Sequence, residues 1–113
     1  MKFEALYDES CDHLVLRQEG SQSYDCHMIH PNLVIDFDEN DQLVAIEFLD
    51  TSQLQVMNPL LSKEFFKDLK EVEVIIETRD MYRVAMLSFE INGQKVLEKV
   101  SLFEFEQPIA LSV

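Results

Sequence analysis

The sequence is poor in glycine, proline and tryptophan. Two Gly, three Pro and no Trp stand among 113 residues, while 47% of the residues are hydrophobic. Collagen-like chains and long disordered segments need the opposite balance, so both classes are excluded. A chain of this length has the usual size of one domain with one core. We therefore expect a single domain over residues 1–113.

Basic residues are also scarce. Nine Lys and Arg stand against 22 Asp and Glu, which gives a formal net charge of -13. Nucleic acids and anionic lipids are bound through positive charge, so we expect no nucleic-acid partner and no membrane partner. An acidic surface favours solubility, cations or a basic protein partner.

Long apolar runs are absent, and cysteine is rare. Nowhere do 18 apolar residues follow one another, as a membrane-spanning helix requires. The first residues also lack the apolar stretch of a signal peptide. These features predict a cytoplasmic protein. In that reducing compartment Cys11 and Cys26 are expected to remain free thiols.

The first half of the chain carries two hairpin patterns. Apolar and polar residues alternate over 3–7 and 14–17, with the polar cluster Asp8-Glu9-Ser10 between them. Two further β-branched, apolar segments at 33–37 and 43–49 are joined by residues of turn composition. Between the hairpins, residues 18–25 are polar and suit a surface loop or a ragged strand. We therefore predict two antiparallel hairpins.

A helix is predicted over residues 59–69. Asn58 is a favourable N-cap residue, and Pro59 suits the first helical position, where no backbone donor is lost. Leu61, Phe65 and Leu69 then recur every four residues and form an apolar stripe. This stripe is expected to pack on the sheet.

The second half has the clearest turn signal. Val72, Val74 and Ile76 alternate with polar residues, Asp80 interrupts the run, and a long segment leads to Asn92-Gly93. This dipeptide is the strongest short hairpin signal, and its two-residue turn fixes the pairing of the flanking strands. The predicted pairs are Ile91 with Gln94, Glu90 with Lys95, Phe89 with Val96, Leu87 with Glu98 and Ala85 with Val100. The predicted core face carries Ala85, Leu87, Phe89, Ile91, Val96, Val100 and Leu102.

These elements predict an α+β fold, with an antiparallel sheet of six or seven strands built from hairpins and one short helix packed on it. The expected parts are a hairpin unit over 1–57, the helix over 58–70 and a C-terminal β-hairpin extension over 71–113. Phe103 and Phe105 alternate with glutamates in a segment that is apolar on both faces. Apolar side chains of this segment that the core does not cover would serve as a protein interface, such as a homodimer edge.

One stretch of the sequence resembles a known family. Its residues are Tyr7-Asp8, Asp12, Leu14-Val15-Leu16 and the run from Leu33 to Ser52, which ends in Leu-Asp-Thr-Ser. In order and spacing they are similar to the small prokaryotic Domain of Unknown Function 2283 family. The resemblance covers residues 1 to about 57. Asp41 stands where members of that family usually carry Gly.

The resemblance implies a fold and carries over no catalytic residue. Some members of the family look like the small partner encoded beside a toxin-like protein, which implies an antitoxin-like neutraliser of a basic partner. Together with the net charge, this favours a non-enzymatic protein-binding module that needs no cofactor. The expected contact residues lie in and beside the acidic turn: Asp36, Asp38, Glu39 and Asp41.

A cluster of thiol and imidazole groups leaves an alternative open. These groups would suit a zinc ion or a Cys-His pair in a small hydrolytic protein, although their spacing fits no standard zinc motif. The residues are Cys11, His13, Cys26, His27 and His30.

A calcium loop is a second alternative. Residues 36–47 place Asp36, Asp38, Asn40 and Glu47 at ligand positions of a helix-flanked calcium loop. However, Asp41 stands where that loop requires Gly, and both flanks have strand composition rather than helix composition. A solvated hairpin turn is therefore the preferred interpretation.

Overall fold

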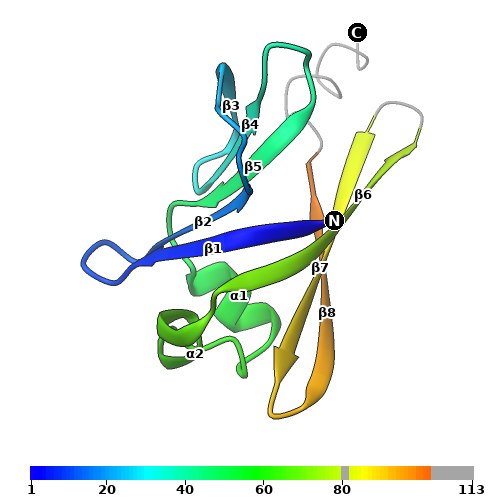
Figure 1. Cartoon of the computed structure of the whole chain (residues 1–113). Helices are drawn as coiled ribbons and strands as arrows, with labels where there is room; N and C mark the ends of the chain where they lie inside the picture. Colours follow the sequence, from blue (N-terminus) through cyan, green and yellow to red (C-terminus); the bar gives the residue numbers. More distant parts are fainter. Residues whose placement is uncertain (80–81, 103–113) are drawn as a thin grey trace, which may run out of the picture.

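Eight antiparallel strands form one sheet in the computed structural model, which describes residues 1–79 and 82–102 (Figure 1). Their order across the sheet is β3-β4-β5-β2-β1-β6-β7-β8. The predicted antiparallel sheet is confirmed, but the predicted count of six or seven strands is too low. The strands are β1 (Lys2–Asp8), β2 (His13–Gln18), β3 (Asp25–His30), β4 (Leu33–Phe37), β5 (Leu43–Phe48), β6 (Glu71–Arg79), β7 (Tyr82–Ile91) and β8 (Gln94–Ser101).

Both hairpins predicted in the first half are present. In β1 and β2, Ala5 lies opposite Leu16, so the apolar side chains of the two strands share one face. In β4 and β5, Ile35 lies opposite Ile46 on that same face. Antiparallel pairing of β2 with β5 then joins the two hairpins.

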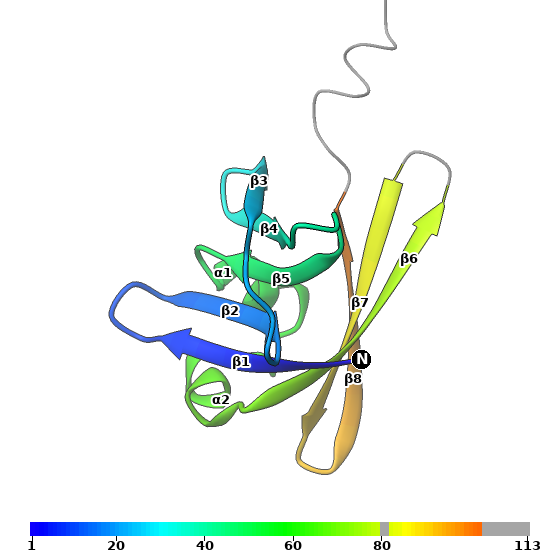
Figure 2. The same ribbon diagram turned by 45° about the horizontal axis from the view of Figure 1, so that its top comes forward.

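β3 is the strand that the sequence did not predict. The chain leaves β2, crosses β5 and β4, and enters β3 at the edge of the sheet (Figure 2). The predicted loop over 18–25 corresponds to this crossing, and β3 begins at its end. A bulge between Met28 and His30 interrupts the alternation of the strand. A strand is recognised in a sequence by apolar residues at every second position, and the bulge breaks this pattern, so the sequence did not reveal β3.

Two short helices replace the single helix predicted over 59–69. They are α1 (Ser52–Met57) and α2 (Lys63–Asp68). Asn58 is the C-cap of α1 and begins a turn, in which its Oδ1 accepts a hydrogen bond from the Leu60 amide at 3.0 Å. The N-cap of α2 is instead Ser62, whose hydroxyl oxygen accepts from the Phe65 amide at 3.2 Å.

The C-terminal hairpin has the predicted register. Ile91 lies opposite Gln94, and all five predicted pairs are present between β7 and β8. Asn92 and Gly93 both have positive φ, at 51° and 78°, which suits the twist of a two-residue hairpin turn. β6 pairs with β1 as well as with β7, so the sheet is continuous between the two halves of the chain.

The sheet curls around the core, and the two helices close one side of the curl (Figures 1 and 2). Phe3 and Phe89 from the strands and Phe66 from α2 are almost completely buried. Phe66 contacts the ring of Tyr7 at a centroid distance of 5.6 Å, and Phe65 contacts the ring of Phe89 at 6.0 Å. α2 therefore connects β1 with β7 across the interior.

Two predicted features lie outside the described residues. These are the interruption at Asp80 and the apolar segment with Phe103 and Phe105. Within residues 1–79 and 82–102, no helix is both long enough and apolar enough to cross a membrane.

Candidate functional site

The turn between β4 and β5 is closed by its own acidic residue. The Asp38 amide donates to the Gln42 carbonyl at 2.9 Å, and the Asp38 side chain accepts from the amides of Asn40 and Gln42, each at 2.9 Å. Glu39 and Asp41 project from this turn and are exposed. The structure therefore divides the predicted contact residues by role: Asp38 holds the turn, while Glu39 and Asp41 present their charges to solvent.

Asp36 does not belong to this exposed surface. It lies on β4 and is only 3% exposed. The Ser23 hydroxyl donates to its Oδ2 at 2.5 Å, and Arg17 lies 3.4 Å from the same oxygen. Arg17 also donates to the Ser23 hydroxyl oxygen at 2.7 Å. Asp36 thus fastens the crossing segment to the sheet, and its expected role as an exposed contact residue is not compatible with this burial.

Glu47 on β5 lies beside Asp36. A side-chain hydrogen bond with Asp36 raises the pKa of Glu47 to about 7, and burial and the charge of Asp36 act in the same direction. Asp36 Oδ1 is buried and accepts no other hydrogen bond from the described residues. When protonated, the Glu47 carboxyl can act as a donor to the Asp36 carboxylate. On the opposite side of Glu47, His13 Nε2 lies 3.5 Å from Oε1.

The crossing segment forms a shallow polar depression with the acidic turn. Residues 20–24 line one wall, and residues 38–40 line the other. Tyr24 ends the crossing segment and is held by its amide, which donates to the Phe37 carbonyl at 2.7 Å. Its side chain is 74% exposed. An exposed aromatic ring thus lies beside the acidic turn, which carries the exposed carboxylates of Glu39 and Asp41.

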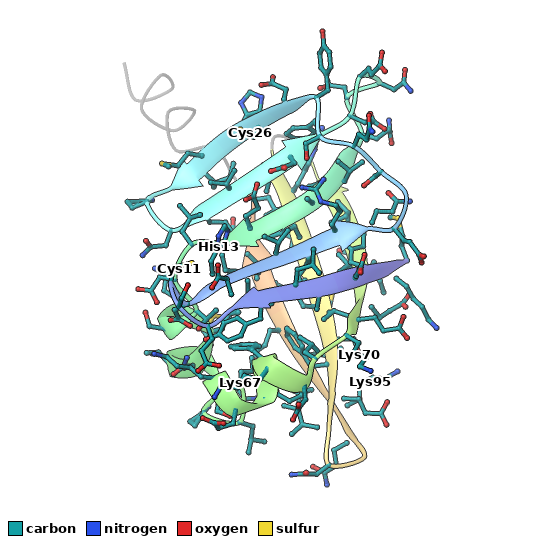
Figure 3. All side chains as sticks on the ribbon, turned by 60° about the vertical axis from the view of Figure 1, so that its left-hand side comes forward. Cys11, His13, Cys26, Lys67, Lys70 and Lys95 are labelled. Atoms are coloured by element: carbon teal, nitrogen blue, oxygen red, sulfur yellow. The ribbon has the colours of Figure 1, made fainter. Side chains whose placement is uncertain are left out.

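The cysteine and histidine residues are not brought together. Cys11 follows β1 and His13 begins β2, whereas Cys26, His27 and His30 lie on β3. β4 and β5 stand between β2 and β3, so the two groups are separated by three strand spacings, roughly 14 Å. Figure 3 shows Cys26 well apart from Cys11 and His13. No cluster of three or more potential metal ligands occurs in the described part of the chain.

The calcium-loop alternative also fails on geometry. Asp36 and Glu47 would bind the ion from the two ends of the loop, but both lie on paired strands. Asp38 already uses its carboxylate within the turn. The solvated hairpin turn is therefore the correct interpretation of residues 38–42.

The sequence did not single out Tyr24, Arg17 or Ser23. Their contacts depend on the crossing between β2 and β3, which no local pattern predicts. A charged residue such as Asp36 inside an otherwise apolar strand was the available signal, because a buried carboxylate requires a partner.

A second polar cluster joins the β1–β2 turn to the start of α1. The hydroxyls of Tyr7 and Thr51 both donate to Asp12 Oδ1 at 2.6 Å. Burial and the hydrogen bond to Asp12 raise the pKa of Tyr7 to about 12. All three residues belong to the stretch in which the sequence resembles a family, and they link its beginning to its end.

Residues 5–52 match the family model DUF2283, described as a protein of unknown function. The resemblance found in the sequence is thereby confirmed for the N-terminal segment. The DUF2283 segment contains β1 to β5 and the first residue of α1, except for the first residues of β1. α2 and β6 to β8 lie outside it. No curated protein matches the chain, and no solved structure matches it.

Proposed function

We propose that this chain is a non-enzymatic module that binds a basic protein, in the manner of an antitoxin-like neutraliser. The contact surface consists of Tyr24, Glu39 and Asp41, and it is called the acidic face below. The observation that carries the proposal is the exposed Tyr24 beside a hydrogen-bonded turn that presents the exposed carboxylates of Glu39 and Asp41.

The backbone of the acidic face is fixed before any partner arrives. Asp38 accepts from two amides of its own turn, and the crossing segment is fastened through Ser23 and Asp36. A preorganised surface loses less conformational entropy on binding than a loop that must become ordered. This arrangement supports recognition of a folded partner.

Side-chain chemistry supports the same proposal. Tyrosine is enriched among residues that dominate binding energy, because its ring offers a large contact area and its hydroxyl a hydrogen bond. Carboxylates at the rim attract a basic partner and raise its rate of association. The net charge of -13 extends this attraction over the whole molecule.

Affinity capture from an extract of the source cells tests the proposal. The immobilised full chain is expected to retain a basic protein that mass spectrometry identifies. Combining Glu39→Gln with Asp41→Asn, or introducing Tyr24→Ala alone, should reduce retention of that protein about tenfold, corresponding to roughly 1.4 kcal/mol of binding energy. Asn at position 41 keeps the positive φ that this position requires.

A matched control removes two charges elsewhere. Glu64→Gln combined with Asp68→Asn changes the net charge equally, but both residues are exposed on α2. Retention should stay close to that of the unmodified chain. If both double variants lost the partner equally, the interaction would be non-specific charge attraction. If the Tyr24 variant and the acidic-turn variant both retained the partner fully, the acidic face would not be the contact surface.

A further inference from the structure

The edge of the sheet at β8 has an apolar pocket beside it. β8 pairs with β7 on one side, and no strand of the described residues pairs with its other side. The pocket has a volume of about 160 Å³. Its apolar lining comes from three parts of the fold: Leu33 and Phe48, Leu54 and Met57, and Val100.

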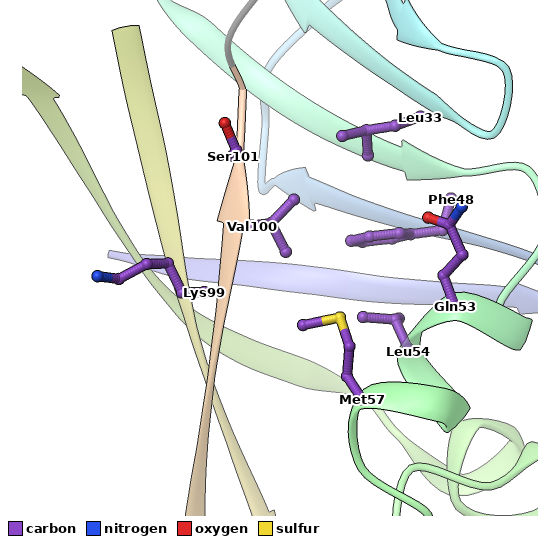
Figure 4. Close-up of a pocket in the computed structure, with 8 residues that line it drawn as sticks. All are labelled: Leu33, Phe48, Gln53, Leu54, Met57, Lys99, Val100 and Ser101. Carbon is purple, nitrogen blue, oxygen red and sulfur yellow. The ribbon is translucent and has the colours of Figure 1, made fainter.

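The pocket lies between the edge of β8 and α1. Figure 4 shows the side chains of Phe48, Leu54, Met57 and Val100 directed into it, whereas the Lys99 side chain points away. Met57 remains 49% exposed although it forms one wall. A cavity of roughly 150 Å³ accepts a molecule of the size of benzene, so this pocket can hold one apolar side chain.

The register of the hairpin determines which peptide groups of β8 face outward. In a two-residue hairpin, the residues next to the turn form a hydrogen-bonded pair, and such pairs recur at every second residue. Ile91 with Gln94 is the first hydrogen-bonded pair. The amide of Leu102 donates to the Arg83 carbonyl, so the same alternation continues beyond the end of β8. The peptide groups of Lys95, Leu97 and Lys99 therefore point away from β7, toward the outer edge of the sheet.

The outer face of β8 carries two basic side chains. Lys95 and Lys99 lie on the face opposite the core, with exposed Leu97 between them. In a chain with nine basic residues and a net charge of -13, this places two lysines along one strand edge. Lysine protects edge strands against self-pairing, since like charges on neighbouring strands repel. If β8 of a second copy paired antiparallel with this edge, with Leu97 opposite Leu97, then Lys95 of each copy would lie opposite Lys99 of the other.

We propose that the edge of β8 and the neighbouring pocket bind an extended peptide segment in which acidic and apolar residues alternate. The segment adds a strand beside β8, where the outward peptide groups of Leu97 and Lys99 supply main-chain hydrogen bonds. Its acidic side chains lie on the outer face with Lys95 and Lys99, and an apolar side chain enters the pocket. This site is separate from the acidic face and does not depend on it.

Fluorescence anisotropy with a labelled hexapeptide of alternating Glu and Leu tests the site on the full chain. Saturable binding is expected, and the same peptide with Lys in place of Glu should bind at least about tenfold more weakly. Lys99→Glu should weaken binding of the acidic peptide about tenfold. The matched charge reversal Lys70→Glu, at an exposed residue outside β8, should leave the affinity unchanged.

A backbone variant separates strand addition from simple charge attraction. Leu97→Pro removes an outward amide donor, and proline is tolerated on an edge strand when its missing donor would face solvent. Binding should be lost while the circular dichroism spectrum is retained. If this variant misfolds, a peptide N-methylated at alternate residues gives the same test, because it cannot donate those main-chain bonds.

Three results would overturn the proposal. The first is no saturation by the acidic peptide up to about 1 mM. The second is equal weakening by Lys99→Glu and Lys70→Glu, which would leave only general charge attraction. The third is a gain of about tenfold in affinity when Phe103→Ser and Phe105→Ser are combined, which would assign the groove to residues of this chain rather than to a partner.

Discussion

Asp12 and Thr51 are 39 positions apart in the sequence, yet the Thr51 hydroxyl donates to Asp12 Oδ1 at 2.6 Å. The Thr51 amide donates to Oδ2 of the same carboxylate at 3.3 Å. Thr51 is fully buried and immediately precedes α1. One carboxylate therefore holds the β1–β2 turn, the Tyr7 hydroxyl and the start of a helix together, within the segment that matches DUF2283.

Asp12→Ala should lower the free energy of unfolding by about 2–3 kcal/mol, because two hydroxyl donors lose a charged acceptor in a partly buried site and alanine is strained at the φ of 57° that Asp12 adopts. Chemical denaturation monitored by circular dichroism measures the change. Asp8→Ala is the control, since the Asp8 carboxylate accepts from the amide and hydroxyl of Ser10 at an exposed turn, and its loss should cost much less. Equal losses in the two variants would contradict the structural role given to Asp12.

The stabilisation by Asp12 should depend on pH. Burial alone would raise the pKa of this carboxyl, but the hydrogen bonds from Thr51 and Tyr7 dominate and lower it. A lowered folded-state pKa contributes stability that is present above the unfolded value of about 3.9 and is lost as the pH falls through the folded pKa. Asp12→Asn should therefore flatten the decline in melting temperature below about pH 4. An unchanged acid profile would contradict this.

Glu47 should behave in the opposite way. Its pKa is raised to about 7 by Asp36, so its contribution to stability is complete below the unfolded value of about 4.3 and is lost as the pH rises through 7. Asp36→Asn removes the neighbouring charge and should return the pKa of Glu47 toward its usual range. Carboxyl carbon NMR measures this titration directly. A Glu47 carboxyl that titrates near its ordinary value in the unmodified chain would contradict its hydrogen bond and charge coupling with Asp36.

The sequence predicted what local chemistry determines. Asn92-Gly93 forms a hairpin whose register follows from the turn alone, and all five pairs agree with the structure. Residues 38–42 form the predicted turn, because strand composition flanks turn composition on both sides. These elements require only neighbours in sequence.

The remaining elements depend on contacts that no local pattern contains. The chain crosses β5 and β4 before it forms β3, and only tertiary pairing decides that path. Asn58 and Ser62 are both good N-cap residues, but a turn follows Asn58 at Pro59 and Leu60, so α2 begins at Lys63 with Ser62 as its N-cap. The burial of Asp36 likewise depends on Ser23 and Arg17, which the crossing brings to it.

Asp41→Gly should stabilise the fold. Asp41 has φ of 64°, where glycine is not strained and other residues are, so a gain of about 0.5–1 kcal/mol is expected. Asp41→Asn removes the same charge while keeping a β-carbon and serves as the control. In thermal unfolding, the glycine variant should have a higher melting temperature than the asparagine variant. The reverse order would show that backbone strain at this turn is not important.

Phe66→Ala should be far more damaging than Phe65→Ala. Phe66 is fully buried against Tyr7, so its removal leaves a cavity and should cost about 3–5 kcal/mol. Phe65 is only partly buried, and its truncation should cost less. Urea denaturation of both variants compares them. Equal costs would support the stripe predicted from the sequence rather than the observed packing of α2.

The melting temperature should rise with moderate salt. Most exposed ion pairs of an acidic surface contribute little, whereas 22 carboxylates against nine basic groups repel one another throughout the folded molecule. Salt reduces this repulsion once the screening length falls to about 10 Å, near 0.1 M. Because unfolding spreads the charges apart, screening stabilises the compact state more than the unfolded one. Calorimetry from low to physiological salt measures the effect, and a flat profile would mean that the repulsion among these carboxylates is energetically unimportant.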